Sequence, residues 1–133
     1  MKILNGDTNP ILKCEVGSGG ATKGDMVVIS SGAVVKAAAA PSAATIIGIA
    51  LETGAQGAFI DVMQIKSGTR IRSEYTGSSK TSLADTDLLT AFDLTDANTV
   101  NLDDTTGGPC VCIGYDNDND TIDFMVVASL LYL

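Results

Sequence analysis

The chain has 133 residues, enough for one domain with a real hydrophobic core, and carries a formal net charge of −8. Its 45% hydrophobic and 18% charged residues exclude a disordered chain, and they predict that some apolar surface is buried between subunits. The acidic balance repels phosphate, which excludes nucleic acid as an expected partner.

The first 23 residues contain turn-forming Gly, Asn and Pro around one short apolar alternation, which comprises Ile11, Leu12, Cys14 and Val16. This pattern predicts an extended N-terminal arm over residues 1–23, suited to adding a strand to a neighbouring subunit or to a shell beneath it. The alternative is a frayed terminus.

Strand signals become regular from Gly24 onward. Residues 26–29 and 33–37 flank a Ser30-Ser31-Gly32 turn and predict a hairpin. Two further strands are expected at residues 45–51 and 58–65, after a connecting loop of small residues that Pro41 keeps from forming a helix.

The second half of the chain is more polar. Residues 69–75 alternate with charged outward positions and predict an edge strand, and residues 85–89 predict one helical turn. Four brief apolar segments follow, at residues 91–94, 99–102, 110–115 and 122–127. The spacing of strands and turns predicts an all-β fold, a small barrel or sandwich that fills residues 24–133 as one domain.

The two halves of this domain, residues 24–65 and 86–127, resemble each other. Four short motifs recur in order: Gly24-Asp25-Met26-Val27 with Thr86-Asp87-Leu88-Leu89, Val35-Lys36-Ala37 with Val100-Asn101-Leu102, Ile47-Gly48-Ile49 with Ile113-Gly114-Tyr115, and Ile60-Asp61-Val62 with Ile122-Asp123-Phe124. They predict an internal pseudo-repeat in which glycine marks a bend or a close approach of strands. The alternative is that any two β-meanders look alike at this level.

The sequence offers little catalytic machinery, because it has no His and no Trp and only three Cys. Cys110 and Cys112 are one residue apart and point to the same face of a strand, which favours buried thiols over a disulfide or a metal site. We therefore expect no enzyme activity, no cofactor and no metal. Asp61 and Asp123 are the carboxylates whose substitution would test a catalytic role.

One acidic run, Asp116-Asn117-Asp118-Asn119-Asp120, echoes the first ligands of a calcium loop. The pattern fails afterwards, because Thr121 occupies the glycine position and Val127 the bidentate glutamate position. A solvated turn is the expectation for this run, with a weak cation contact as the alternative.

Neither end of the chain predicts a membrane role. Residues 1–10 contain no apolar core of a signal peptide, and the apolar run at residues 124–133 is too short to span a bilayer as a helix. Thiol usage fits a reducing cytoplasm.

The stretch from Lys23 to Val62 resembles a known family. Its motifs are Lys23-Gly24-Asp25-Met26-Val27-Val28, Gly32-Ala33-Val34-Val35-Lys36-Ala37, Ile46-Ile47-Gly48-Ile49-Ala50 and Ile60-Asp61-Val62. They look like the core of bacteriophage capsid decoration (cement) proteins. The resemblance implies a small β-barrel or β-tulip, often trimeric, that binds the outside of an icosahedral head and clamps the major capsid protein. It also implies synthesis in the bacterial cytoplasm and a final place in the virion, with no catalytic residue.

Within this interpretation, the residues expected to contact the capsid are Ile3, Leu4, Ile11 and Leu12 in the arm. The residues expected to contact other subunits are Leu130, Leu131, Tyr132 and Leu133, since a terminal apolar run left in water favours aggregation. The alternatives are another phage structural part, such as a head-fibre base or tail component, and a β domain that binds a glycan or small ligand. For the latter, Tyr75 and Tyr115 are the candidate aromatic contacts.

Overall fold

The structure is a computed structural model that describes residues 1–41 and 45–126, and it confirms the all-β prediction. The strands are β1 (Lys2–Ile3), β2 (Ile11–Glu15), β3 (Met26–Ser30), β4 (Ala33–Lys36), β5 (Ile46–Ala50), β6 (Phe59–Gln64), β7 (Ile71–Thr76), β8 (Ala91–Asp96), β9 (Thr99–Asn101), β10 (Cys110–Asp116) and β11 (Thr121–Val126). A 3-10 helix, η2 (Asp85–Asp87), lies where the sequence predicts a helical turn.

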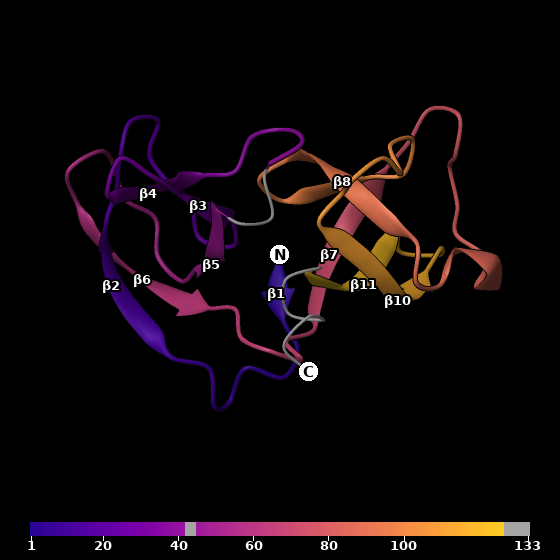
Figure 1. Cartoon of the computed structure of the whole chain (residues 1–133), viewed down its shortest axis with the longest axis horizontal. Helices are drawn as coiled ribbons and strands as arrows, with labels where there is room; N and C mark the ends of the chain where they lie inside the picture. The colour runs from indigo at the N-terminus through magenta and orange to yellow at the C-terminus, as the bar shows by residue number, and fades with distance from the viewer. Residues whose placement is uncertain (42–44, 127–133) are drawn as a thin grey trace.

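The strands form two lobes, shown on the left and right of Figure 1. In the first lobe the strand order is β2-β6-β5-β3-β4, and a parallel bridge between Val16 and Val34 joins the last strand to the first. This bridge closes the sheet into a small barrel over residues 11–64, called the N-barrel below.

The second lobe closes in the same way. Its order is β7-β11-β10-β8-β9, and parallel pairing of β9 with β7 completes the ring, in which Tyr75 lies opposite Val100. This is the C-barrel, residues 71–126. Closing a sheet removes the unpaired edges that a short open sheet would expose.

The two barrels share one topology, strand for strand, with β2 to β6 corresponding to β7 to β11. Cross-strand registers align them residue by residue: Lys13 faces Asp61 as Arg72 faces Asp123, and Ala50 faces Val62 as Cys112 faces Phe124. The equivalent core positions are buried in both barrels: Val16 and Tyr75, Val27 and Phe92, Val34 and Val100, Ala50 and Cys112, Ile60 and Ile122, Val62 and Phe124.

These registers differ in part from the motif alignment predicted from the sequence. Ile60-Asp61-Val62 does correspond to Ile122-Asp123-Phe124. Met26, however, corresponds to Ala91 and Ile49 to Val111. Val34, and not Val35, corresponds to Val100, so three of the four predicted pairings are shifted along the chain. Each half is a closed barrel of its own, and the repeat includes β2 and β7, which lie outside the predicted halves 24–65 and 86–127.

The first 23 residues also differ from the extended arm that the sequence predicts. β1 pairs with β7 of the C-barrel, and β2 pairs along its whole length with β6 of the N-barrel. The segment looks isolated in sequence because β2 finds its partner about fifty residues later along the chain. Likewise β7, expected as an edge strand, lies between β11 on one side and β1 and β9 on the other.

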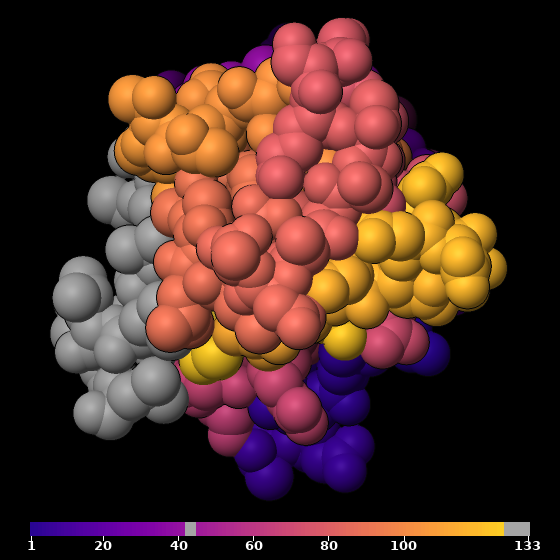
Figure 2. All heavy atoms as spheres, turned by 90° about the vertical axis from the view of Figure 1, so that its right-hand side faces the viewer, coloured from indigo at the N-terminus to yellow at the C-terminus, as the bar shows by residue number. Residues whose placement is uncertain are grey.

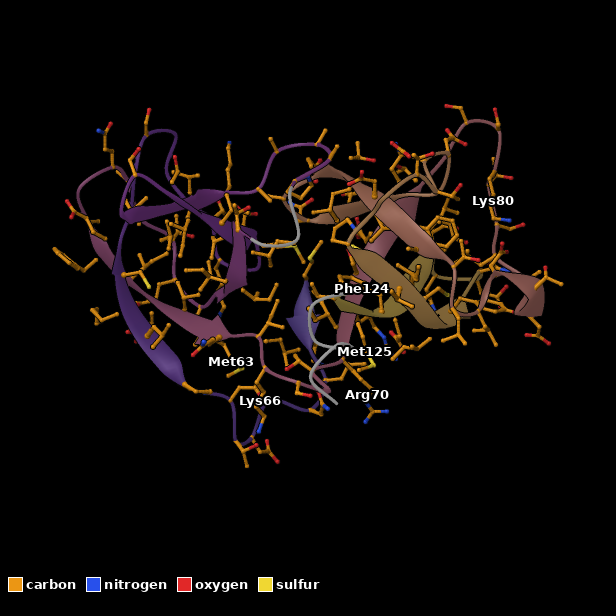
Figure 3. The ribbon with its side chains drawn as sticks, viewed as in Figure 1. Met63, Lys66, Arg70, Lys80, Phe124 and Met125 are labelled. Carbon is orange, nitrogen blue, oxygen red and sulfur yellow. The ribbon has the colours of Figure 1, made fainter. Side chains whose placement is uncertain are left out.

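The barrels meet along an apolar seam. Met26, Ala37 and Ile49 of the N-barrel are buried in the same hydrophobic cluster as Leu94 and Ala97 of the C-barrel. Residues 65–70 connect the barrels, and Lys66 and Arg70 mark this junction in Figure 3. The N-terminal segment reinforces it, since the Asn5 side chain bonds to Gly68 and Arg70 backbone atoms.

Candidate interaction surfaces

Two of the four predicted capsid-contact residues are exposed on β2, at consecutive positions that point to opposite faces of the strand. Ile11 is 57% exposed and Leu12 36%, although both belong to a paired strand. Within the described residues, no strand pairs with the opposite edge of β2 before Val16. An exposed strand edge with aliphatic side chains is suited to pairing with a strand of another protein.

The other two predicted contact residues lie elsewhere. Ile3 and Leu4 are half-buried at the junction, where Ile3 packs against the C-barrel cluster and the Leu4 amide donates to the Arg70 carbonyl at 2.8 Å. The structure therefore does not gather the four residues into one surface. The predicted subunit contacts Leu130, Leu131, Tyr132 and Leu133 lie outside the described residues.

Two further apolar patches were not predicted from the sequence. The first, the hairpin end, lies on the N-barrel, where Ile29 and Phe59 are 52% and 62% exposed at a groove of about 350 Å³. The second, the leucine end, is Leu88 and Leu89 in the loop between η2 and β8. Period-two alternation assigns Ile29 and Phe59 to strands, but only the closure of the barrel decides which apolar side chains at its end remain exposed.

Charge is divided unequally between the barrels. The N-barrel, residues 11–64, carries three basic and four acidic side chains, whereas the C-barrel, residues 71–126, carries two basic and eleven acidic ones. The net charges are −1 and −9. The N-barrel is thus the half that meets an acidic partner surface with less repulsion.

The two carboxylates whose substitution would test a catalytic role both pair with basic side chains. Asp61 pairs with Lys13 at 2.8 Å, and Asp123 accepts two hydrogen bonds from the Arg72 guanidinium. These carboxylates hold the pKa of Lys13 and of Arg72 above their ordinary values, through hydrogen bonding first and charge second. The pairs occupy equivalent positions in the two barrels, so they mark the repeat.

The cysteine thiols have raised pKa values. Burial is the main cause for Cys14, Cys110 and Cys112, so each thiol is less ionised at neutral pH than an exposed cysteine. In the described part of the chain, no three His, Cys, Asp or Glu side chains gather closely enough to hold a metal ion.

The acidic run at residues 116–120 forms a turn between β10 and β11. The Asp116 carboxylate accepts hydrogen bonds from the Asp118 and Asn119 backbone and from the Asn119 side chain, and these bonds lower its pKa. The Asn117 amide oxygen accepts from the Tyr75 hydroxyl and the Leu83 backbone. The side-chain oxygens of Asp116 and Asn117 are therefore used in holding the loops together.

A cavity of about 440 Å³ lies beside the N-terminus, lined by Lys2, Lys23, Arg72 and Glu74 among others. The Met1 amine donates to the Gly24 carbonyl at 2.8 Å, and partial burial lowers the pKa of this amine. The cavity thus lies where the N-terminal segment bridges the two barrels.

No known protein family and no curated protein matches this chain. Across residues 1–41 and 45–126, no helix is long and apolar enough to cross a membrane.

Proposed function

We propose that this protein is a bacteriophage capsid decoration protein that binds the outer surface of the head and stabilises the major capsid shell. The observation that carries the proposal is the apolar strand edge of β2, which presents Ile11 and Leu12 on the nearly neutral N-barrel. The resemblance of residues 23–62 to the cement family supports it, and so does the all-β architecture.

The proposed binding mode has a simple physical basis. Each copy buries little apolar area through β2, but many symmetry-related copies on one shell act together, so the assembled shell gains avidity that no single contact provides. The acidic C-barrel would face solvent, where its charge favours solubility.

The test is co-sedimentation of the purified protein with phage heads that lack decoration. Removing residues 1–23 would take β2 out of the N-barrel, so point variants of the full chain are required. Ile11→Thr combined with Leu12→Thr removes the apolar surface and keeps β-propensity, whereas Ile11→Val with Leu12→Ile keeps both.

The parent chain and the conservative variant should bind heads saturably and raise their melting temperature. The threonine variant should bind roughly tenfold or more weakly, since about 1.4 kcal/mol corresponds to tenfold and two buried aliphatic contacts exceed that. If the parent chain binds none of the heads tested, or if the threonine variant binds equally well, the proposal fails.

The glycan-binding alternative has less support. Tyr75 is 5% exposed, so its ring offers no free stacking face of the kind sugar sites use. Tyr115 is half-buried, and its hydroxyl donates to Asp85 at 2.7 Å. A different phage structural part would share the fold, and the head-binding experiment separates it from a cement protein.

A further inference from the structure

One hairpin of the C-barrel reaches across to the N-barrel. The turn between β8 and β9 reaches the N-barrel, where the Ala97 carbonyl accepts from the Met26 amide at 2.7 Å and the Leu94 carbonyl accepts from the Ala40 amide at 3.3 Å. Leu94 and Ala97 are both buried there. The C-barrel therefore uses its hairpin end as a docking element, and the N-barrel supplies the acceptor surface around Met26.

The same hairpin exists in the N-barrel without a partner. By register, Ile29 of β3 corresponds to Leu94 of β8, because Ile29 pairs with Val34 as Leu94 pairs with Val100. Leu94 is 1% exposed and Ile29 52% exposed. The N-barrel covers the hairpin end of the C-barrel. Among the described residues, no segment covers the hairpin end of the N-barrel in the same way.

The acceptor surface is repeated as well. Gly24 corresponds to Leu89, since the Gly24 amide donates to Ala50 at 2.8 Å and the Leu89 amide donates to the equivalent Cys112 at 2.7 Å. Both residues have positive φ, +91° and +67°. The acceptor position Met26 corresponds to Ala91, so the leucine end borders the surface on which an equivalent hairpin would dock.

Leu89 is unusual for this position. A leucine in the left-handed region is strained where glycine is not, yet Leu89 retains this conformation while 74% of its surface faces solvent. In the N-barrel, the Met1 amine bonds to the equivalent Gly24. The strained, exposed leucine thus occupies a position that is covered in the first barrel.

The two patches lie at opposite ends of the long axis. The hairpin end belongs to the lobe on the left of Figure 1, and the leucine end follows η2 in the lobe on the right. Figure 2 looks onto that right-hand lobe, with the segment around residues 80–95 facing the viewer. We propose that the hairpin end of one copy, Ile29 and Phe59, docks on the leucine end of a second copy, Leu88 and Leu89, repeating between molecules the contact that joins the barrels.

Charge disfavours a contact between two leucine ends. Two C-barrels face to face would bring together net charges of −9 each, whereas the proposed contact places a barrel of net charge −1 against one of −9. A hairpin-to-leucine contact is heterologous, so it generates a ring if the rotation between copies closes and a filament if it does not.

Interactions within the loop hold the leucine end in one conformation. Lys80, labelled at the right of Figure 3, pairs with Asp87 at 2.9 Å. Asp103 accepts three backbone hydrogen bonds from Ser78, Ser79 and Lys80 at the base of the same loop. Because these interactions order the loop before binding, less conformational entropy is lost when a second copy docks.

The test uses sedimentation velocity on the full chain over a wide concentration range. The parent chain should self-associate, and two variants should each associate at least tenfold more weakly: Ile29→Ser with Phe59→Ser at the hairpin end, and Leu89→Gly at the leucine end. The Leu89→Gly variant relieves backbone strain, so loss of folding cannot explain its effect. Ile11→Ser, which removes a side chain of similar exposure outside both patches, should associate like the parent.

A mixture of the two variants decides the pairing. The Leu89→Gly chain retains a hairpin end and the Ile29→Ser/Phe59→Ser chain retains a leucine end, so an equimolar mixture should form a heterodimer and nothing larger. A monomeric parent chain at all concentrations, an Ile11→Ser variant as defective as the others, or a mixture that stays monomeric would overturn the proposal. Because different residues are involved, failure here leaves the head-binding proposal standing, and the reverse also holds.

Discussion

At the scale of single residues, Leu89 adopts a backbone conformation that is strained for a leucine. Its φ of +67° is one that glycine adopts freely in the equivalent turn of the N-barrel. Leu89→Gly should therefore stabilise the monomeric chain by about 1 kcal/mol, measured by urea denaturation at a concentration below association. Leu88, next in the chain but with φ of −58°, is the control, and Leu88→Gly should give no stabilisation. Equal effects of the two changes would show that strain at Leu89 is negligible.

Asp103 gives a pH-dependent prediction. Hydrogen bonds from the Lys80, Ser78 and Ser79 backbone amides hold the pKa of Asp103 below its ordinary value of 3.8. Desolvation of the carboxylate acts in the opposite direction but is outweighed. A depressed folded-state pKa means that the stabilisation is present above 3.8 and is lost as the pH falls through the folded value. Asp103→Asn should thus lower the melting temperature at neutral pH, and the difference from the parent should shrink in acid. A difference that is constant with pH would contradict this account.

At the scale of strands, the two glycines that the sequence pairs in the repeat have different roles. A Cβ on Gly48 would overlap the Met63 carbonyl across the β5–β6 pair, whereas one on Gly114 would meet Asp123 at 3.7 Å, an ordinary contact. Gly48→Ala should destabilise the protein by about 1–3 kcal/mol through overpacking, and Gly114→Ala should cost less than about 1 kcal/mol. The comparison is made by urea denaturation, and a larger loss at Gly114 would be inconsistent with the strand spacing.

Periodicity located most strands but not their neighbours. Hairpins such as β3–β4 were predictable because both strands and the Ser31-Gly32 turn are adjacent in sequence. β2 was assigned to an arm because its pattern is short and its partner β6 lies far along the chain. Of the residues predicted to contact the capsid, Ile11 and Leu12 are exposed on β2, whereas Ile3 and Leu4 lie half-buried at the junction.

At the scale of the whole molecule, the seam joins the barrels through Met26, which is fully buried between them. Met26→Ala should lower the free energy of unfolding by about 2–5 kcal/mol, the range for a buried large-to-small change. Met125→Ala, on the half-buried outer side of β11, should cost less. Chemical denaturation followed by circular dichroism measures both, and equal losses would mean that the seam contributes little.

The all-β class, the strand and turn periodicity and the acidic charge follow from the sequence alone, because these depend on local propensity and on composition. The three-dimensional fold was needed to find that each half closes into its own barrel, that Met26 corresponds to Ala91, and which apolar side chains remain in water. Closure depends on the parallel contacts Val16–Val34 and Tyr75–Val100, which join strands that are not consecutive in sequence. Side-chain alternation cannot specify such contacts, because a period of two gives the faces of a strand but not the identity of its neighbour.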